Sequence, residues 1–404
     1  MTALLCGCKR DKPVLHGESS DTRVPLFGKD IAPFIFKNCS GCHSAEGMAP
    51  FALTNYKQIA ARAGMIQYVL EEGLMPPWKP DATYSEFTGQ VKLDAEDIRM
   101  FRNWVMCGKP KDNGDENLKY APVKQNELAD DSSIIYVTAE TEFVHPGDGL
   151  DHYAVFTMPL DSKKGLYVRK IELVNQNKKI MHHAWLGCLP EGIKPESVSP
   201  EMLTSILVAG FLPGMTSTFW PEGYYKYIEP GTRLLVSTHY AHYNKQERDR
   251  PQLKLYTIPK PPESEKQVKL YMVLEDSLLE NTFALPKDTI TELHIQHTLH
   301  KDMLVLALTP HMHFRGQKFT AFALRPASND TIPLIRINDW DFNWQNIYYY
   351  KNPVQLKAGD VVNVIGTFNN TAKYIRNPVV PTVEVKHGDR SLDEMLEMMM
   401  EVAN

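Results

Sequence analysis

Short runs of β-branched and aromatic residues, separated by Pro, Gly, Asn and Asp, fill the sequence from residue 134 to its C-terminus. Many such runs with few helical stretches between them indicate packed β-sheets. The stretch is longer than one sandwich needs, so we predict two, meeting near the proline-containing segment Lys260–Glu265. Strands are expected at Ile134–Val137, Tyr153–Met158, Tyr167–Val174, Arg233–Tyr240, Leu253–Thr257, Val268–Val273, Met303–Thr309, Phe319–Leu324 and Val361–Phe368.

The segment before this β-rich region has a helical pattern. Apolar residues recur at close to helical spacing in Tyr56–Glu72, and Asp94–Cys107 begins with acidic residues and is followed by Gly108 and Pro110. The stretch Lys109–Ser133 is rich in charged and polar residues and is typical of a linker. The chain of 404 residues is therefore expected to join a small helical domain to a larger β-rich region.

Composition excludes some classes of protein. The 44 basic and 49 acidic residues give a net charge of -5, and no basic patch indicates a nucleic-acid partner. No apolar run is long enough to span a bilayer. Of the six cysteines, Cys107 and Cys188 remain outside the motifs described below, and they are either free or paired with each other.

The N-terminus resembles the end of a bacterial lipoprotein signal. In Leu5–Cys8 the last cysteine would carry the lipid, and a basic run follows at once. The basic start and long apolar stretch of a complete signal are missing, so residues 1–25 are interpreted as a truncated leader and tether. The alternative is a disordered N-terminus with two incidental cysteines.

The most specific motif of the helical segment is Cys39-Ser-Gly-Cys42-His43. The two thiols of a Cys-x-x-Cys-His run add to the vinyl groups of a haem, and the adjacent histidine binds the iron. A zinc or thioredoxin-like site is the competing interpretation. It is disfavoured because no second cysteine pair follows at zinc spacing and no βαβ pattern surrounds the motif.

A second axial ligand is expected downstream. Met75 precedes two prolines that stiffen its loop, and a thioether ligand would raise the iron potential. Met48 and Met65 are rivals, and a buried core methionine is the non-functional alternative. Residues 28–110 resemble class I cytochrome c domains. The resemblance implies covalent attachment at Cys39 and Cys42, with His43 as proximal and Met75 as distal ligand.

Histidines recur in the β-rich region at spacings that suit a metal. His311 and His313 would share one face of a strand, because strand side chains alternate. His182 and His183 would point to opposite faces unless they lie at a strand end or a bulge. Imidazole suits copper, zinc and iron, whereas a methionine thioether selects Cu(I).

These segments carry a second resemblance. Residues 134–404 look like the copper type II, ascorbate-dependent monooxygenases, the family of peptidylglycine α-hydroxylating monooxygenase and dopamine β-monooxygenase. The matching segments follow the family's order: Met181–Cys188, Val236–Tyr240, His311–Gly316 and Asp393–Met395, with Trp340–Gln345 similar to bacterial members. The family fold is two jelly-roll β-sandwiches with one copper on each and a solvent-filled cleft between them.

The resemblance implies a ligand set for each copper. His182, His183 and His239 would hold the electron-accepting copper. The copper that binds oxygen and substrate would be held by His311, His313 and Met395, which are therefore the predicted catalytic residues. Alternatives from the sequence are His242 in place of His239, a core role for Met395 beside Met398, Met399 and Met400, and packing roles for His294, His297 and His300.

Two departures from the family bear on the substrate. The arginine that anchors the peptide carboxylate stands two positions before the His-x-His, where this chain has Thr309. The substrate-contacting tyrosine stands four positions after the methionine ligand, where this chain has Met399. Peptide amidation is therefore disfavoured.

The expected fold class is multidomain, an N-terminal all-α cytochrome c domain followed by two all-β jelly-roll sandwiches. The domains would span 26–122 (haem domain and linker), 123–262 and 263–404. The predicted function is hydroxylation of an aliphatic C–H of a small substrate with O2. Its cofactors would be two copper ions, one haem c and ascorbate as a candidate reductant, with a periplasmic electron donor.

Two further hypotheses compete with this function. A haem electron carrier or copper-binding protein without oxygenase activity is the first, and a zinc or iron protein built on the same residues is the second. The haem motif requires export, so the protein is expected in the periplasm or at the cell surface, anchored through Cys8.

Overall fold

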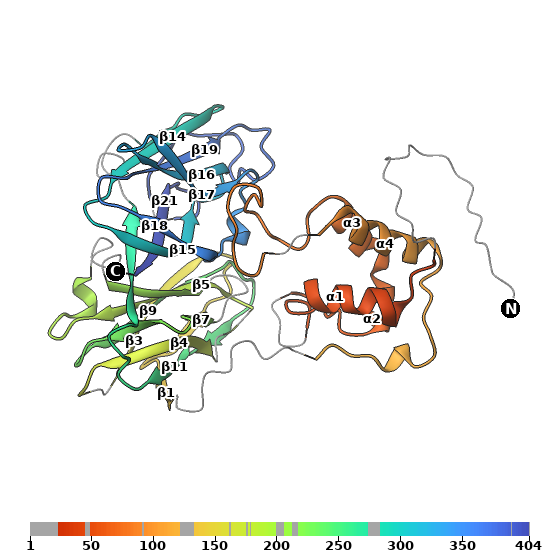
Figure 1. The fold of residues 1–404 in the computed structure, drawn as a ribbon, viewed down its shortest axis with the longest axis horizontal. Coiled ribbons are helices and arrows are strands. Elements are labelled where there is room, and N and C mark those ends of the chain that lie inside the picture. The colour runs from red at the N-terminus through yellow and green to blue at the C-terminus, as the bar shows by residue number, and fades with distance from the viewer. Residues whose placement is uncertain are drawn as a thin grey trace, which may run out of the picture. The chain divides into compact units, whose positions relative to one another are not determined.

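The computed structural model describes residues 23–44, 49–90, 93–121, 133–160, 163–174, 177, 179–198, 206–211, 217–273, 283–388 and 390–403. The chain divides into two units. Unit 1 comprises Met1–Trp78 and Val91–Asn126, and unit 2 comprises Lys79–Gln90 and Glu127–Asn404 (Figure 1). The leader and the anchor cysteine Cys8 lie outside the described residues, as does the rival ligand Met48.

Unit 1 buries one apolar cluster among short helices. Phe27, Ile35, Ile59, Phe101 and Trp104 are fully buried in it. The helices are η1 (Phe27–Ile31, a π-helix), α1 (Ala32–Asn38), α2 (Tyr56–Ala61), α3 (Ala63–Glu71), α4 (Ala95–Met106) and the 3-10 turn η2 (Asp115–Asn117). No helix of the described residues is long and apolar enough to cross a membrane.

The longest helix, α4, shows why its sequence is helical. The side chain of Asp94 caps it by accepting hydrogen bonds from the backbone N–H groups of Glu96 and Asp97, at 2.9 and 2.8 Å. The helix then buries Phe101 and Trp104 on one face and ends before Gly108, whose φ is 82°.

The prediction of an N-terminal all-α cytochrome c domain is wrong as a fold class. The structure is 43% strand and 14% helix, and its described residues contain four short α-helices and no sizeable all-α N-terminal domain. Glycine and proline end or interrupt helices, and the segment from Gly73 to Pro80 contains one glycine and three prolines. The predicted helix Tyr56–Glu72 is divided at Arg62, and Lys79–Gln90 belongs to unit 2 instead of unit 1.

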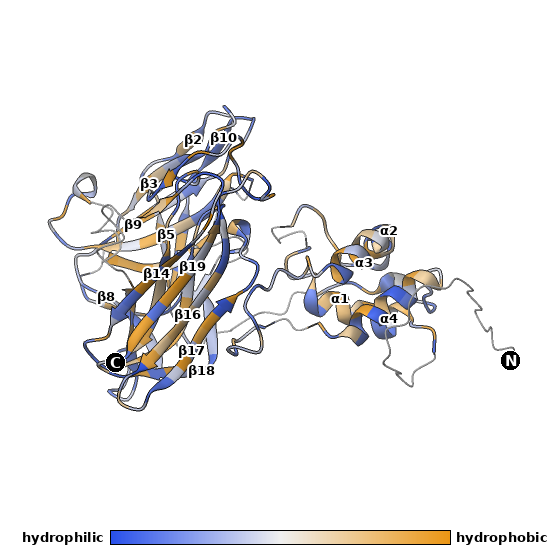
Figure 2. Cartoon of the chain, turned by 90° about the horizontal axis from the view of Figure 1, so that it is seen from above, coloured by the Kyte–Doolittle hydropathy of each residue, from blue (hydrophilic) through white to orange (hydrophobic). Residues whose placement is uncertain are grey.

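Unit 2 is built from β-sheets, and its largest sheet has nine strands. Its order is β1 (Ser133–Thr138), β11 (Gln252–Ile258), β4 (Leu166–Val174), β8 (Tyr224–Ile228), β12 (Lys266–Val273), β21 (Glu397–Ala403), β15 (Met303–His311) and β18 (Tyr348–Leu356), with β7 (Ser217–Phe219) paired to β4. Burial alternates along β11, where Leu253 and Leu255 are fully buried between half-buried neighbours. In Figure 2, orange apolar residues recur along the strands and blue residues along many of the loops.

Two four-stranded sheets carry most of the other histidine-bearing strands. The first is β3 (His152–Met158), β9 (Arg233–Tyr240), β5 (Met181–Leu189) and β6 (Leu207–Phe211); the second is β14 (Ile290–Thr298), β19 (Val361–Asn369), β16 (Gly316–Arg325) and β17 (Asp330–Ile337). Small pairs and turns complete the unit: β10 (Glu247–Asp249) with β2 (Phe143–His145), β13 (Ala284–Leu285) with β20 (Val385–Lys386), η3 (Pro195–Ser197) and η5 (Phe342–Trp344).

The prediction of two separate jelly-roll sandwiches also needs correction. The nine-stranded sheet continues across the predicted boundary at Lys260–Glu265, because β12 pairs in parallel with β8 through Lys266–Tyr224 and Gln267–Tyr225. Parallel pairing between distant segments leaves no local pattern in the sequence.

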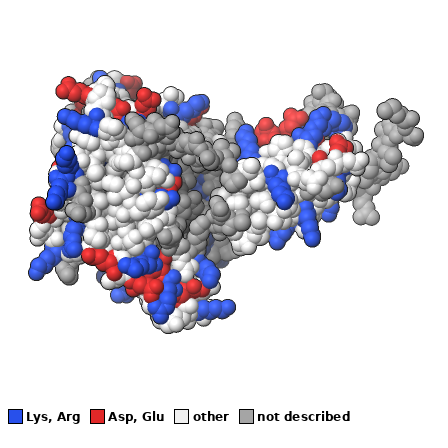
Figure 3. Space-filling model, turned by 90° about the horizontal axis from the view of Figure 1, so that it is seen from below, with Lys and Arg blue, Asp and Glu red and all other residues white. Residues whose placement is uncertain are grey.

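Figure 3 shows that charged side chains of both signs lie around the margin of one face of unit 2 and leave much of its centre uncharged.

Candidate metal centres

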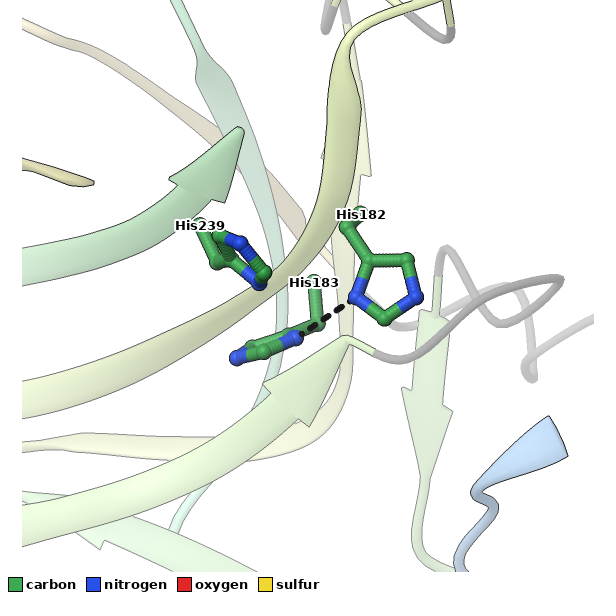
Figure 4. A group of neighbouring side chains, drawn as sticks. All are labelled: His182, His183 and His239. Atoms are coloured by element: carbon green, nitrogen blue, oxygen red, sulfur yellow. Dashed lines mark hydrogen bonds between the residues drawn. The ribbon is translucent and has the colours of Figure 1, made fainter. Parts of the chain in front are cut away.

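The first histidine cluster lies where β5 and β9 pair in unit 2. Met181 is opposite Tyr240 and His183 is opposite His239, so His182 is an extra residue at a register shift. A β-bulge turns a side chain away from the alternation of a regular strand. The shift therefore lets two consecutive histidines approach the same neighbour, His239, as Figure 4 shows.

The three imidazoles are close enough to share one ion. One ring nitrogen from each of His182, His183 and His239 lies within 4.8 Å of the others. The Nδ1 atoms of His182 and His183 are 3.1 Å apart, and the ring of His239 lies 5.3 and 4.9 Å from their ring centroids (Figure 4). Three imidazoles with a fourth open position are a common ligand set for a transition metal.

The ring nitrogens of His239 give the clearest indication that this cluster binds a metal ion. Its side chain is 4% exposed, and neither ring nitrogen makes a hydrogen bond within the described part of the chain. The carboxylate of Asp151 lies 3.3 Å from Nε2 without completing one. A buried polar atom without a partner is costly, and a metal ion on one ring nitrogen removes that cost.

The second cluster follows β15. The prediction placed His311 and His313 on one strand face, but β15 ends at His311 and His313 lies in the turn beyond it. Their ring centroids are nevertheless 5.0 Å apart. Hydrogen bonds from other segments, instead of the strand pleat, hold the two rings together.

The hydrogen bonds of His311 fix which nitrogen is free. Gln345 Nε2 donates to the carbonyl of Phe342 at 3.0 Å, so Gln345 Oε1 faces Nδ1 of His311 as an acceptor. The proton of His311 is therefore on Nδ1, and Nε2 carries the lone pair. A partner on the far nitrogen orients many metal-binding histidines in this way.

His313 is held by the segment that carries Met395. Its Nδ1 donates to the carbonyl of Asp393 at 3.1 Å, and its backbone N–H donates to the carboxylate of Glu394 at 2.9 Å. Met395 is the next residue and is 8% exposed. Burial raises the pKa of Glu394 to about 8, although its bonds to the backbone N–H groups of His313 and Arg315 act in the opposite direction.

Burial keeps the histidines of both clusters uncharged. It lowers the pKa of His182 and of His311 to about 4, and that of His313 to about 3, where repulsion from His311 adds to the effect. Burial also lowers the pKa of His183 and His239. Neutral imidazole is the form that binds a metal, so the clusters are ready for ligation at neutral pH.

Metal-free protein is expected to lose stability as the pH falls from about 6.5 to about 4. Over this range the histidines take up protons in the unfolded chain but not in the folded one, which favours unfolding by up to about 1.4 kcal/mol per pH unit for each histidine. Urea unfolding at pH 7, 6 and 5 measures the loss. His311→Gln should reduce it and His242→Gln, at an exposed site, should not; equal slopes in the two variants would refute this account.

The alternatives left by the sequence are placed as follows. His242 is 77% exposed, whereas His239 lies in the first cluster. His294 bonds Asn363 on the neighbouring strand β19 at 2.9 Å, and His297 bonds Tyr271 on β12 of the nine-stranded sheet at 2.6 Å, so both have partners. Met398, Met399 and Met400 are buried in β21.

Sequence reasoning missed one further cluster. Ligand atoms of His145, Asp148 and His152 lie within 4.8 Å of one another. There Nε2 of His152 lies 2.9 Å from Asp148, and Nδ1 of His145 accepts a hydrogen bond from Gly147 N–H. Nε2 of the buried His145 has no hydrogen-bond partner among the described residues. His145, Asp148 and His152 are three and four positions apart, and this spacing does not match a common metal-binding motif. The cluster was therefore not predicted from the sequence.

The Cys-x-x-Cys-His motif of unit 1 directly follows α1. His43 Nδ1 donates to the carbonyl of Phe51 at 3.0 Å, so Nε2 is the nitrogen left to bind iron. Cys39 and Cys42 are free thiols, and burial raises the pKa of Cys39 to about 12. Met75 lies in the turn after α3 and is half-buried, whereas its rival Met65 is 45% exposed. The cysteines and His43 thus fit a covalently bound haem.

Comparison with protein families shows that one part of the chain is similar to a class of copper-dependent oxidoreductases. Residues 280–395 match the family described as copper type II ascorbate-dependent monooxygenase, C-terminal domain. The family depends on copper and ascorbate. The matched range contains His311, His313 and Met395 and covers neither the first histidine cluster nor the Cys-x-x-Cys-His motif.

Two other comparisons were made, with curated proteins and with solved structures. A search of curated proteins finds no match. The solved structure of PNGF-II is similar at 9% identity and a TM-score of 0.28, over 67% of this chain and 65% of that one, which is less than two thirds of its length. Allantoicase matches at 12% identity and a TM-score of 0.17 over 54% and 77% of the two chains, and the STIV MCP at 9% and 0.21 over 61% and 99%.

Proposed function

We propose that the protein is an exported copper monooxygenase that hydroxylates an aliphatic C–H of a small molecule. His182, His183 and His239 would hold the electron-accepting copper, and His311, His313 and Met395 the copper that binds O2. The observation that carries the proposal is the pair of buried, uncharged imidazole clusters in one unit, the second of them inside the family match. Bound copper would supply O2 activation and one-electron redox chemistry.

The chain's own residues would prepare both sites for this chemistry. Gln345 and the Asp393 carbonyl hold the protons of His311 and His313 on Nδ1, so each Nε2 would be available to bind the ion. The reaction consumes one O2, two electrons and two protons for each C–H converted to C–OH, and releases one water. Ascorbate, or a haem bound at Cys39, Cys42 and His43 with Met75 as distal ligand, would supply the electrons.

The substrate proposal rests on two buried side chains. Thr309 and Met399 are register partners on β15 and β21 and are 5% and 4% exposed. They stand where the resembling peptide hydroxylase has its arginine and tyrosine for substrate binding. Neither carries a charge, so we propose a substrate that is not anchored there through a carboxylate.

The haem relay follows from joining a redox module to an oxygenase in one chain. A tether raises the effective concentration of the electron donor at its acceptor. Covalent haem attachment takes place outside the cytoplasm, so the relay and a lipid anchor at Cys8 support a place in the periplasm or at the cell surface. A periplasmic donor would then reduce the haem.

The test is product analysis with labelled O2. Protein loaded with copper, reduced with ascorbate and mixed with candidate small molecules should give a product carrying one labelled oxygen. In a second arm, haem reduced beforehand should reoxidise with O2 faster when copper is bound. Full copper loading without labelled product from any candidate would favour the non-oxygenase carrier, and copper-independent reoxidation would remove the relay.

A further inference from the structure

The segment Trp340–Gln345 contacts both histidine clusters through buried side chains without supplying a predicted ligand. It contains the short turn η5, which Asp341 caps by accepting a hydrogen bond from Asn343 N–H at 3.0 Å. Trp340, Phe342 and Gln345 are 2, 5 and 5% exposed. The cap and the burial fix the turn in place.

Two of these side chains hold the second cluster. Gln345 accepts the Nδ1–H of His311, and Trp340 Nε1 donates to the carbonyl of His313 at 3.2 Å. The ring of Trp340 packs closely against the backbone at Gly316, where an added Cβ would lie 2.6 Å from the ring. The segment therefore positions both histidines of that cluster from outside.

The third side chain reaches both clusters. The ring of Phe342 is stacked on His182 with centroids 5.6 Å apart, and it meets His313 edge to face at 5.5 Å. Phe314 packs against the same ring at 4.5 Å. One aromatic side chain thus touches a histidine of each cluster, and its burial leaves little room for water beside it.

We propose that Phe342 is a positioning residue that sets the separation of the two copper sites and provides the direct contact for electron transfer between them. The inference rests on the proposed function. Copper held by His182, His183 and His239 would supply one electron in each turnover to the site of His311 and His313. The ring of Phe342 would give that electron a direct contact path in place of a longer route through solvent, which would limit the release of partly reduced oxygen as hydrogen peroxide.

The experiment compares Phe342→Leu and Phe342→Ala with Phe283→Leu in copper-loaded full-length protein. Phe283 also belongs to unit 2, is 5% exposed and packs on Phe368, so it controls for the loss of a buried ring. Each variant is first checked for two bound copper ions. Pulsed electron paramagnetic resonance of the Cu(II) form then measures the distance between the two ions.

Both Phe342 variants are expected to hold two copper ions, to show a broader distance distribution, and to release several-fold more hydrogen peroxide per O2 consumed than Phe283→Leu. Distances and peroxide yields equal to those of Phe283→Leu would overturn the role of Phe342 while leaving the proposed function intact. Failure of the unsubstituted protein to bind two copper ions would overturn both. A Phe342 variant that lost one copper would also contradict a role in coupling, since its effect would then be on ligation.

Discussion

Replacing His183 by alanine is expected to leave about one copper ion bound per chain in place of two, because a three-imidazole site that loses one ligand binds its metal far more weakly. His183 is the ligand candidate best placed for this test. It is opposite His239 in the β5–β9 register and touches His182. His311→Ala should remove the other ion, leave the first cluster occupied and abolish the hydroxylated product.

Metal analysis after dialysis, combined with product detection, measures this result. The matched control is His242→Ala, which changes an exposed histidine three positions after His239 and should keep both ions. Unfolding of each variant by urea, followed by circular dichroism, separates ligand loss from misfolding. Two copper ions retained by both His183→Ala and His311→Ala would place the metals elsewhere and remove the monooxygenase proposal.

The sequence predicted individual segments well where the determinants are local. Asp94 and the acidic first turn after it indicated a helix, and α4 begins there. Adjacent histidines raised the need for a bulge or strand end, and the register shift at His182 is a bulge. In each case neighbouring residues carry the information, so spacing alone was sufficient.

The overall architecture depends on pairings that leave no such pattern. The contact of β8 with β12 merges the expected sandwiches into one large sheet, and it joins residues about forty positions apart. Lys79–Gln90 belongs to unit 2, and isolated β-bridges join it to that unit from Pro80 to Ile337 and from Phe87 to Tyr350. The all-α domain was predicted because helical periodicity can be recognised in the sequence. The sequence does not show how much of the chain between the helices is irregular.

The histidine clusters also combine features that the sequence predicts with features that only the folded chain creates. His311 and His313 could be selected from their spacing, but the bond from Gln345, 34 residues later, that fixes the free nitrogen of His311 could not. Trp340–Gln345 was noted as a resembling segment, and its contacts with both histidine clusters are a property of the folded chain.

The largest stability loss is expected from Glu401→Ala, at about 3–5 kcal/mol of unfolding free energy. Glu401 is 2% exposed on β21 and accepts a hydrogen bond from Trp220 Nε1 at 2.8 Å. Lys226 on β8 is 4% exposed. Burial lowers its pKa below the usual value, and attraction to Glu401 acts in the opposite direction without reversing the shift. Removing Glu401 leaves a buried indole N–H without its acceptor and takes away the negative charge that favours the protonated form of the buried Lys226.

Urea unfolding at neutral pH measures the effect, with Glu222→Gln at an exposed position as the control. Glu401→Gln separates the two contributions, because its amide oxygen can still accept from Trp220 while the negative charge beside Lys226 is lost. It should therefore cost less than Glu401→Ala but more than Glu222→Gln. If Glu401→Ala matched the control, the pair would not stabilise the junction of β8, β12 and β21, and the continuity of the nine-stranded sheet would depend on backbone pairing and apolar packing alone.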